Sequence, residues 1–231
     1  MKGISNMKII ARIKTDFPTK FGIPRQSGLV ENLKGKIVFE PEYRNPDALN
    51  GLEGFSHIWL LWGFSENPER SSFRATVRPP RLGENRHLGV FATRSPFRPN
   101  GIGLSCVRIE NIIKTPNEGT VIEVRGADMV DGTPIYDIKP YIPYTDCISD
   151  ASGGFTEETK WHTLTVVLKD NARNILPEDK EKSLIGILSE DPRPAYQKKD
   201  PERIYGFPFA GHEVKFQVKD DVLTVLSISC E

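Results

Sequence analysis

The chain has 231 residues, and its 31 Lys+Arg side chains balance its 31 Asp+Glu side chains, so net charge does not indicate a nucleic-acid partner. Its hydrophobic content of 38% and aromatic content of 9% suffice for a packed core and exclude wholesale disorder. The length exceeds the roughly 100–200 residues of an ordinary domain and predicts one main domain with a smaller appendage.

Short strands are expected through the first part of the chain, at apolar or β-branched runs bounded by turn signals. These runs are Lys8–Ile13, Lys36–Phe39, Phe55–Phe64, Val107–Ile113 and Thr120–Val124. One helical turn is expected at Pro46–Leu52, and only short regular structure at 65–89, where prolines are frequent. The segment Ile135–Tyr144 is expected to be extended, because Pro140 and Pro143 exclude a helix.

These elements predict a mainly β fold, an antiparallel barrel or sandwich, for residues 1–150. The best linker is Ala151–Gly154, and the character of the sequence changes after it. Residues 151–231 are predicted to form a small α+β domain with a strand, a helix and a terminal hairpin. These elements are expected at Trp161–Leu168, Pro177–Ser189 and Val214–Ile228.

The cysteines and histidines are dispersed. The sequence has three cysteines and four histidines, without a CxxC pair or a Cys/His cluster of zinc spacing, so we expect no metal site. The opening stretch MKGISNMKIIARIK lacks the apolar run of a signal peptide, and no stretch approaches the roughly 20 apolar residues of a membrane span. We therefore expect a cytoplasmic protein without membrane attachment, with Met7 as an alternative start to Met1.

Arginines are concentrated in one segment. Arg70–Arg108 contains eight arginines, no lysine and a single acid, Glu84. A guanidinium offers a planar fork for phosphate or carboxylate and a face for stacking on rings. Ion pairs with acids elsewhere in the fold are the alternative for most of them. Arg94 and Arg98 are the best candidates for an anionic ligand, because prolines stiffen their loop.

Several other residues have both a functional and a structural interpretation. Asp128 lies in small and apolar company, where a carboxylate needs a partner. Asp131 is either a second acidic candidate or part of a turn with Gly132, and His57 is interpreted as a core histidine. The glycines of Gly101–Gly103 do not fit a dinucleotide-binding fingerprint and are expected to permit a bend or the close approach of a ligand.

The segment Asp191–Tyr196 combines a proline-stiffened backbone with Arg193 and Tyr196, residue types that stack on bases. A plain loop at the exit of the preceding helix is the alternative. The sequence offers no Ser/His/Asp triad, no pair of glycosidase carboxylates and no P-loop.

Taken together, the motifs resemble the TsaA-like family, the TrmO-type tRNA methyltransferases. The motifs that carry this resemblance run in family order over nearly the whole chain. They are Pro24–Gln26, Arg78–Gly83, the stretch GVFATRSPFRPN (89–100), Asp128–Pro134, Asp137–Tyr141 and Asp191–Tyr196.

The resemblance implies a β-barrel enzyme that uses S-adenosyl-L-methionine and has no Rossmann fold. It also implies a homodimer with the cofactor near the subunit interface. The implied substrate is tRNA carrying N6-threonylcarbamoyladenosine next to the anticodon, and the implied product is its N6-methylated form. Two alternatives stay open: a non-catalytic RNA-binding module, and an enzyme acting on a small phosphorylated or carboxylated metabolite.

The resemblance also assigns residues to roles. The cofactor is expected to contact Arg25, Gln26, Ser65, Glu66, Arg94, Leu104, Arg125, Gly126, Ala127 and Asp128. Because the urea-substituted adenine nitrogen must lose a proton, we expect a general base. Asp128 and Tyr196 are the first candidates for it, and Asp131 is the next. Arg98, Arg193 and Tyr196 are expected to contact RNA.

Overall fold

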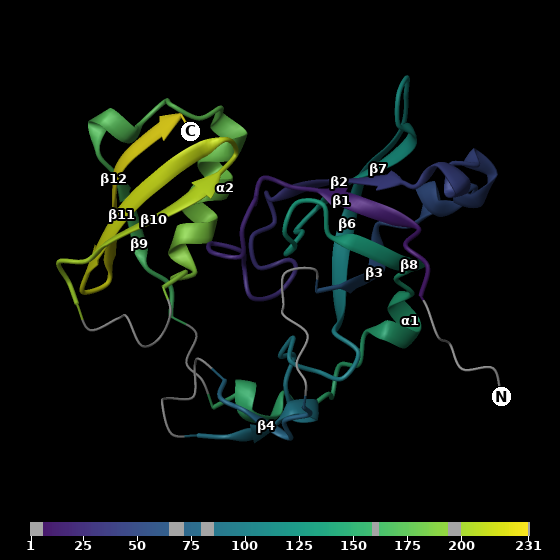
Figure 1. Cartoon of the computed structure of the whole chain (residues 1–231), viewed down its shortest axis with the longest axis horizontal. Coiled ribbons are helices and arrows are strands. Elements are labelled where there is room, and N and C mark those ends of the chain that lie inside the picture. The colour runs from purple at the N-terminus through teal and green to yellow at the C-terminus, as the bar shows by residue number, and fades with distance from the viewer. Residues whose placement is uncertain (1–6, 65–71, 80–85, 159–161, 194–199, 231) are drawn as a thin grey trace.

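The computed structural model describes residues 7–64, 72–79, 86–158, 162–193 and 200–230. Figure 1 shows two separate sheets, one built from the first part of the chain and one from the last. Within the described residues, no helix is long and apolar enough to cross a membrane.

The first sheet contains six antiparallel strands in the order β1-β2-β7-β6-β3-β8, and β8 pairs with β1 so that the order closes. The strands are β1 (Ala11–Lys14), β2 (Lys34–Phe39), β3 (His57–Gly63), β6 (Ile102–Thr115), β7 (Gly119–Arg125) and β8 (Pro134–Pro140). Side chains alternate between buried and exposed along β1 and β2, as the period of a strand requires. Ile13, Ile37, Ile58 and Ile135 are fully buried between the strands.

Short elements connect these strands. The expected helical turn is present as the 3-10 helices η2 (Pro46–Leu49) and η3 (Leu52–Gly54). The short structure expected between 65 and 89 includes β4 (Thr76–Val77) and β5 (Leu88–Gly89), which pair with each other. The remaining 3-10 helices are η1 (Pro41–Tyr43), η4 (Val90–Ala92), η5 (Gly154–Thr156) and η6 (Asp170–Ala172).

The expectation that Pro143 excludes a helix was wrong. The chain forms the four-residue helix α1 (Pro143–Asp146), and Pro143 is its first residue. The first helical N–H has no partner inside a helix, so proline costs nothing at this position.

The second sheet contains four strands in the order β10-β11-β12-β9. The elements are β9 (Thr165–Leu168), α2 (Glu178–Ser189), β10 (Ile204–Phe209), β11 (His212–Lys219) and β12 (Val222–Cys230). The predicted helix and terminal hairpin are both present, and the sequence analysis missed β10. The fully buried residues Leu184, Ile187 and Leu188 give α2 an apolar face toward the sheet core.

The segment between β1 and β2 packs into the core of the second sheet. Phe17, Val30 and Leu33 belong to the same buried cluster as the apolar residues of α2 and β10. Gly22 has a φ of +92°, and a Cβ there would lie 2.5 Å from the ring of Phe207. In Figure 1 this segment leaves β1 and extends to α2. The second sheet and α2 thereby fix the loop that carries the predicted cofactor residues Arg25 and Gln26.

Candidate active site

The loop at 25–28 contacts the arginine-bearing loop at 90–100. The guanidinium of Arg94 donates through Nη1 to Oε1 of Gln26, and Nε2 of Gln26 donates to the carbonyl oxygen of Arg25. Arg94 is exposed, and its charge also acts on Asp128. Three predicted cofactor residues from distant parts of the sequence therefore lie together.

The same loop meets the end of β7 through two glycines. The N–H of Gly28 donates to the carbonyl of Gly126 at 3.0 Å, and the N–H of Gly126 donates to the carbonyl of Leu33 at 2.8 Å. Both glycines have a φ of +78°, and a Cβ on Gly126 would lie 3.1 Å from the backbone of Gly28. Only glycine permits this approach at Gly126 without strain. It places the backbone of Ala127 and Asp128 beside the loop.

Asp128 is held by a chain of hydrogen bonds that crosses the sheet. The hydroxyl of Ser105 donates to Oδ1 of Asp128 at 2.6 Å, and Nε1 of Trp62 donates to the oxygen of Ser105 at 2.9 Å. Burial raises the pKa of Asp128 from its ordinary 3.8 to about 6. The hydrogen bonds from Ser105 and from the backbone at Asp128 and Ser27, together with the charge of Arg94, lower the pKa and limit that rise. The carboxyl can therefore exchange a proton near neutral pH.

Leu104 and Arg125 are two further predicted cofactor residues. The side chain of Leu104 is 52% exposed and lies on the face of β6 opposite to that of the buried Ser105. Arg125 pairs with Glu110, which raises the pKa of the guanidinium and lowers the pKa of the carboxyl. Arg125 thus ties β7 to β6, and its side chain is engaged within the sheet.

Arg98 is used inside its own loop. Its Nη1 donates to the carbonyl oxygens of Val90 at 3.1 Å and Thr93 at 2.7 Å, and its guanidinium lies 5.4 Å from the ring centroid of Phe91. These contacts hold the loop in shape. They support a structural role for Arg98, and its contact with RNA stays a prediction.

Other described arginines of the arginine-rich segment also bond to protein groups, as the structural alternative expected. These are Arg78 with His87, Arg86 with Glu158, and Arg108 with Glu31.

Arg193 is buried, with 7% of its surface exposed. Its Nε and Nη2 donate to the two carboxylate oxygens of Asp191 at 2.8 and 3.2 Å. In this arrangement Arg193 does not present its charge to RNA, so its expected RNA contact is not supported. Tyr196, the other predicted residue of this segment, lies outside the described residues, as do Ser65 and Glu66.

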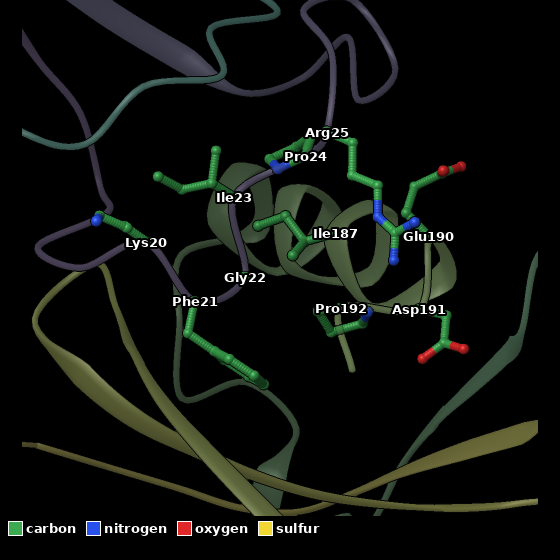
Figure 2. Close-up of a pocket in the computed structure, with 10 residues that line it drawn as sticks. All are labelled: Lys20, Phe21, Gly22, Ile23, Pro24, Arg25, Ile187, Glu190, Asp191 and Pro192. Atoms are coloured by element: carbon green, nitrogen blue, oxygen red, sulfur yellow. The ribbon is translucent and has the colours of Figure 1, made fainter. Parts of the chain in front are cut away.

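A pocket of about 280 Å³ separates the 20–25 loop from the end of α2. Figure 2 shows the 20–25 loop and the end of α2 lining this pocket, with the side chain of Arg25 drawn toward Glu190. The predicted cofactor loop and the start of the segment predicted to contact RNA therefore line the same pocket.

Two other candidates have structural roles. Oδ1 of Asp131 accepts a hydrogen bond from the N–H of Thr15 at 2.9 Å, which fits the turn interpretation. His57 is half-buried and does not belong to the core as predicted: its Nδ1 lies 2.9 Å from the hydroxyl of Ser56, and its imidazole packs edge-on against Tyr141. Among the described side chains, no group of His, Cys, Asp and Glu could hold a metal ion.

Ser27, Trp62 and Ser105 were not among the predicted site residues. The register of β3 and β6 links the last two, because it pairs Trp62 with Gly103, two residues before Ser105. Ser27 is adjacent to the predicted pair Arg25 and Gln26. Gly103 was expected to permit close approach of a ligand, and the group that approaches it is the Trp62 indole. Gly101 has a φ of +50° and provides the expected bend.

The family models for the tRNA-methyltransferase O N-terminal domain and the TrmO C-terminal domain match residues 12–147 and 162–231. The chain belongs to the tRNA-methyltransferase O family. A tRNA (adenine(37)-N6)-methyltransferase of Escherichia coli is 35% identical over 226 residues, covering 95% of each chain. A Pseudomonas aeruginosa protein, whose name describes an S-adenosylmethionine-dependent methyltransferase, is 40% identical over 228 residues, covering 95% of this chain and 96% of the relative.

Solved structures of the family share the fold. A crystal structure of TrmO from P. aeruginosa superposes with a TM-score of 0.80 at 33% identity, covering 100% of this chain and 99% of that one. The likeness spans both sheets, and it confirms the family that the motifs predicted.

Proposed function

We propose that this chain transfers a methyl group from S-adenosyl-L-methionine to the N6 nitrogen of adenosine 37 in tRNA. The modified nucleoside is N6-threonylcarbamoyladenosine. The observation that carries the proposal is the convergence of the 25–28 loop, Arg94 and residues 126–128 around Asp128. The relative in E. coli carries the name of this activity and matches this chain almost from end to end.

The residues that converge fit the parts of the cofactor. Arg94 offers free guanidinium donors for a carboxylate, and Leu104 offers an exposed apolar face for a ring. The N–H of Gly126 is used by Leu33 and the N–H of Asp128 by its own carboxyl, so the backbone of Ala127 and the carbonyl of Asp128 are the groups proposed to recognise the adenine edge. Bound there, S-adenosyl-L-methionine supplies a methyl group on a positively charged sulfur.

Asp128 is the proposed base. The acceptor nitrogen bears one hydrogen, and its lone pair is delocalised into the adenine and the urea group. Asp128 takes that proton as the nitrogen–methyl bond forms and the sulfur–methyl bond breaks, so that S-adenosylhomocysteine and a protonated carboxyl result. With a pKa of about 6, Asp128 is mostly ionised at neutral pH and can accept the proton. Alignment of nitrogen, methyl and sulfur supplies on the order of 7–11 kcal/mol of the barrier reduction.

The second sheet and α2 are proposed to hold the anticodon arm next to the pocket of Figure 2. Arg193 takes part by fixing Asp191 and thereby the start of the segment that carries Tyr196. The proposal also includes the division of the chain into two domains at 150/151, with the closed first sheet as a β-barrel domain. It further includes a homodimer and a cytoplasmic location. The exposed Phe91 and Leu104 provide apolar surface for a partner subunit near the cofactor.

The deciding experiment is mass spectrometry of nucleosides from tRNA that carries the threonylcarbamoyl group without the methyl group. The tRNA is incubated with the full chain and S-adenosyl-L-methionine, and we expect a gain of one methyl on that nucleoside. Saturable cofactor binding without the gain would indicate another methyl acceptor. Absence of both would indicate a non-catalytic RNA-binding module. A methyl gain on a small metabolite without RNA would indicate the third alternative.

A further inference from the structure

Ser105 occupies a buried position at the centre of the hydrogen-bond chain. Its side chain belongs to β6, and 1% of the residue is exposed. An indole N–H can only donate, so the hydroxyl oxygen of Ser105 must accept from Nε1 of Trp62 at 2.9 Å. The single hydroxyl proton is then directed to Oδ1 of Asp128 at 2.6 Å. The donor that Asp128 meets is therefore fixed in direction as well as in position.

The sequence of β6 is adapted to this arrangement. Gly103 pairs with Trp62 across the two strands, and a Cβ on Gly103 would lie 2.2 Å from Cε2 of the indole. Any side chain there would displace the ring and its N–H. Gly103 thus allows the indole to lie over β6 and reach the hydroxyl of Ser105.

We propose that Ser105 is a positioning residue for methyl transfer, which holds one carboxylate oxygen of Asp128 and leaves the other to take the proton. This inference rests on the proposed function, in which Asp128 is the base. A hydroxyl that donates to a carboxylate stabilises the ionised form. Ser105 therefore counteracts the burial of Asp128 and keeps the base ionised at neutral pH, where Asp128 would otherwise be protonated.

The test is the pH dependence of kcat for Ser105→Ala in the full chain, with threonylcarbamoylated tRNA. Loss of a hydrogen bond to the charged carboxylate should raise the pKa of the base, so the acidic limb of the kcat profile should move to higher pH by about one to two units. The rate should fall about five- to fiftyfold near pH 6 and recover toward pH 9, where the base is ionised in both proteins. Ser105→Thr keeps the donor and should restore the wild-type limb.

Ser183→Ala is the matched control. Ser183 is also a buried serine, 2% exposed, and its hydroxyl bonds to two backbone carbonyls on α2 and the adjacent loop. Its replacement should lower stability without moving the acidic limb. A uniform loss of kcat at every pH in Ser105→Ala, or an unchanged limb, would overturn the proposal.

Two further variants separate the possible failures. If Ser105→Ala does not fold, Trp62→Phe removes the indole N–H that orients the hydroxyl and keeps an aromatic ring in the core, and a smaller shift of the acidic limb to higher pH is expected. An unmoved limb in that variant also counts against the inference. Full activity in Asp128→Asn would instead refute the base itself. If Asp128→Asn is inactive and the limb of Ser105→Ala is unmoved, the proposed function stands and the role of Ser105 fails.

Discussion

The replacement Asp128→Asn should stabilise the protein against unfolding, and the gain should grow with pH. Folding raises the pKa of Asp128 from 3.8 to about 6. Between these two values the folded state binds more protons than the unfolded state, so the free energy of unfolding falls as pH rises. The asparagine has no such proton to lose, and its stability is free of this dependence.

The magnitude follows from the two pKa values. The interval from 3.8 to about 6, at about 1.36 kcal/mol for each pH unit, corresponds to about 3 kcal/mol over the whole range. About 1.4 kcal/mol of it falls between about pH 5 and pH 7.5, because about one pH unit separates pH 5 from the folded-state pKa. The stability advantage of Asp128→Asn over the wild type should therefore increase by about 1.4 kcal/mol between these conditions.

Urea denaturation of both proteins at the two pH values measures this double difference, in which pH effects from all other groups cancel. Asp131→Asn removes one negative charge from the same loop at an exposed position, keeps an oxygen that can accept from the N–H of Thr15, and so controls for net charge. An advantage of the same size at both pH values would refute the reasoning, because it would mean that Asp128 does not take up its proton on folding in this range.

Three other variants test the packing and the cofactor site. Gly22→Ala places a Cβ against the Phe207 ring at a positive φ, and it should cost about 2 kcal/mol or more in urea denaturation. Arg193→Ala leaves the Asp191 carboxylate buried without its ion pair and should cost about 3–5 kcal/mol, whereas replacing both residues by alanine should cost less than the single change. Arg94→Lys should weaken S-adenosyl-L-methionine binding about tenfold by calorimetry with little change in melting temperature, because lysine lacks the planar fork.

Local patterns in the sequence account for the strands and the main helix. The alternation in β1 and β2 and the apolar run of β3 are properties of consecutive residues, as are the proline start and spacing of α2. β10 was missed because its sequence, IYGFPF, contains a glycine and a proline that normally mark loops. It is a strand because it lies at the edge of its sheet, where Pro208 needs no second partner strand.

The candidate site depends on contacts between distant residues, which local patterns do not contain. The resemblance of the motifs to the family predicted that Gln26, Arg94 and Asp128 share one site. The links from Trp62 to Ser105 and from Ser105 to Asp128 span 43 and 23 residues. The first depends on the register of β3 against β6, and the second on the register of β6 against β7. A one-residue change of register would turn Ser105 to the other face of the sheet. The same sequence would then lack these two hydrogen bonds.

The two arginines of the 90–100 loop, Arg94 and Arg98, have different roles in the structure. Arg98 donates to the carbonyls of Val90 and Thr93, and the carbonyl of Val90 also accepts from the N–H and the hydroxyl of Thr93. Arg94, on the same loop, is exposed and donates to Gln26. The sequence does not distinguish the roles of the two arginines, because both carry the same charge and lie in the same proline-containing loop. The carbonyls within reach decide which arginine shapes the loop and which is left to meet a ligand.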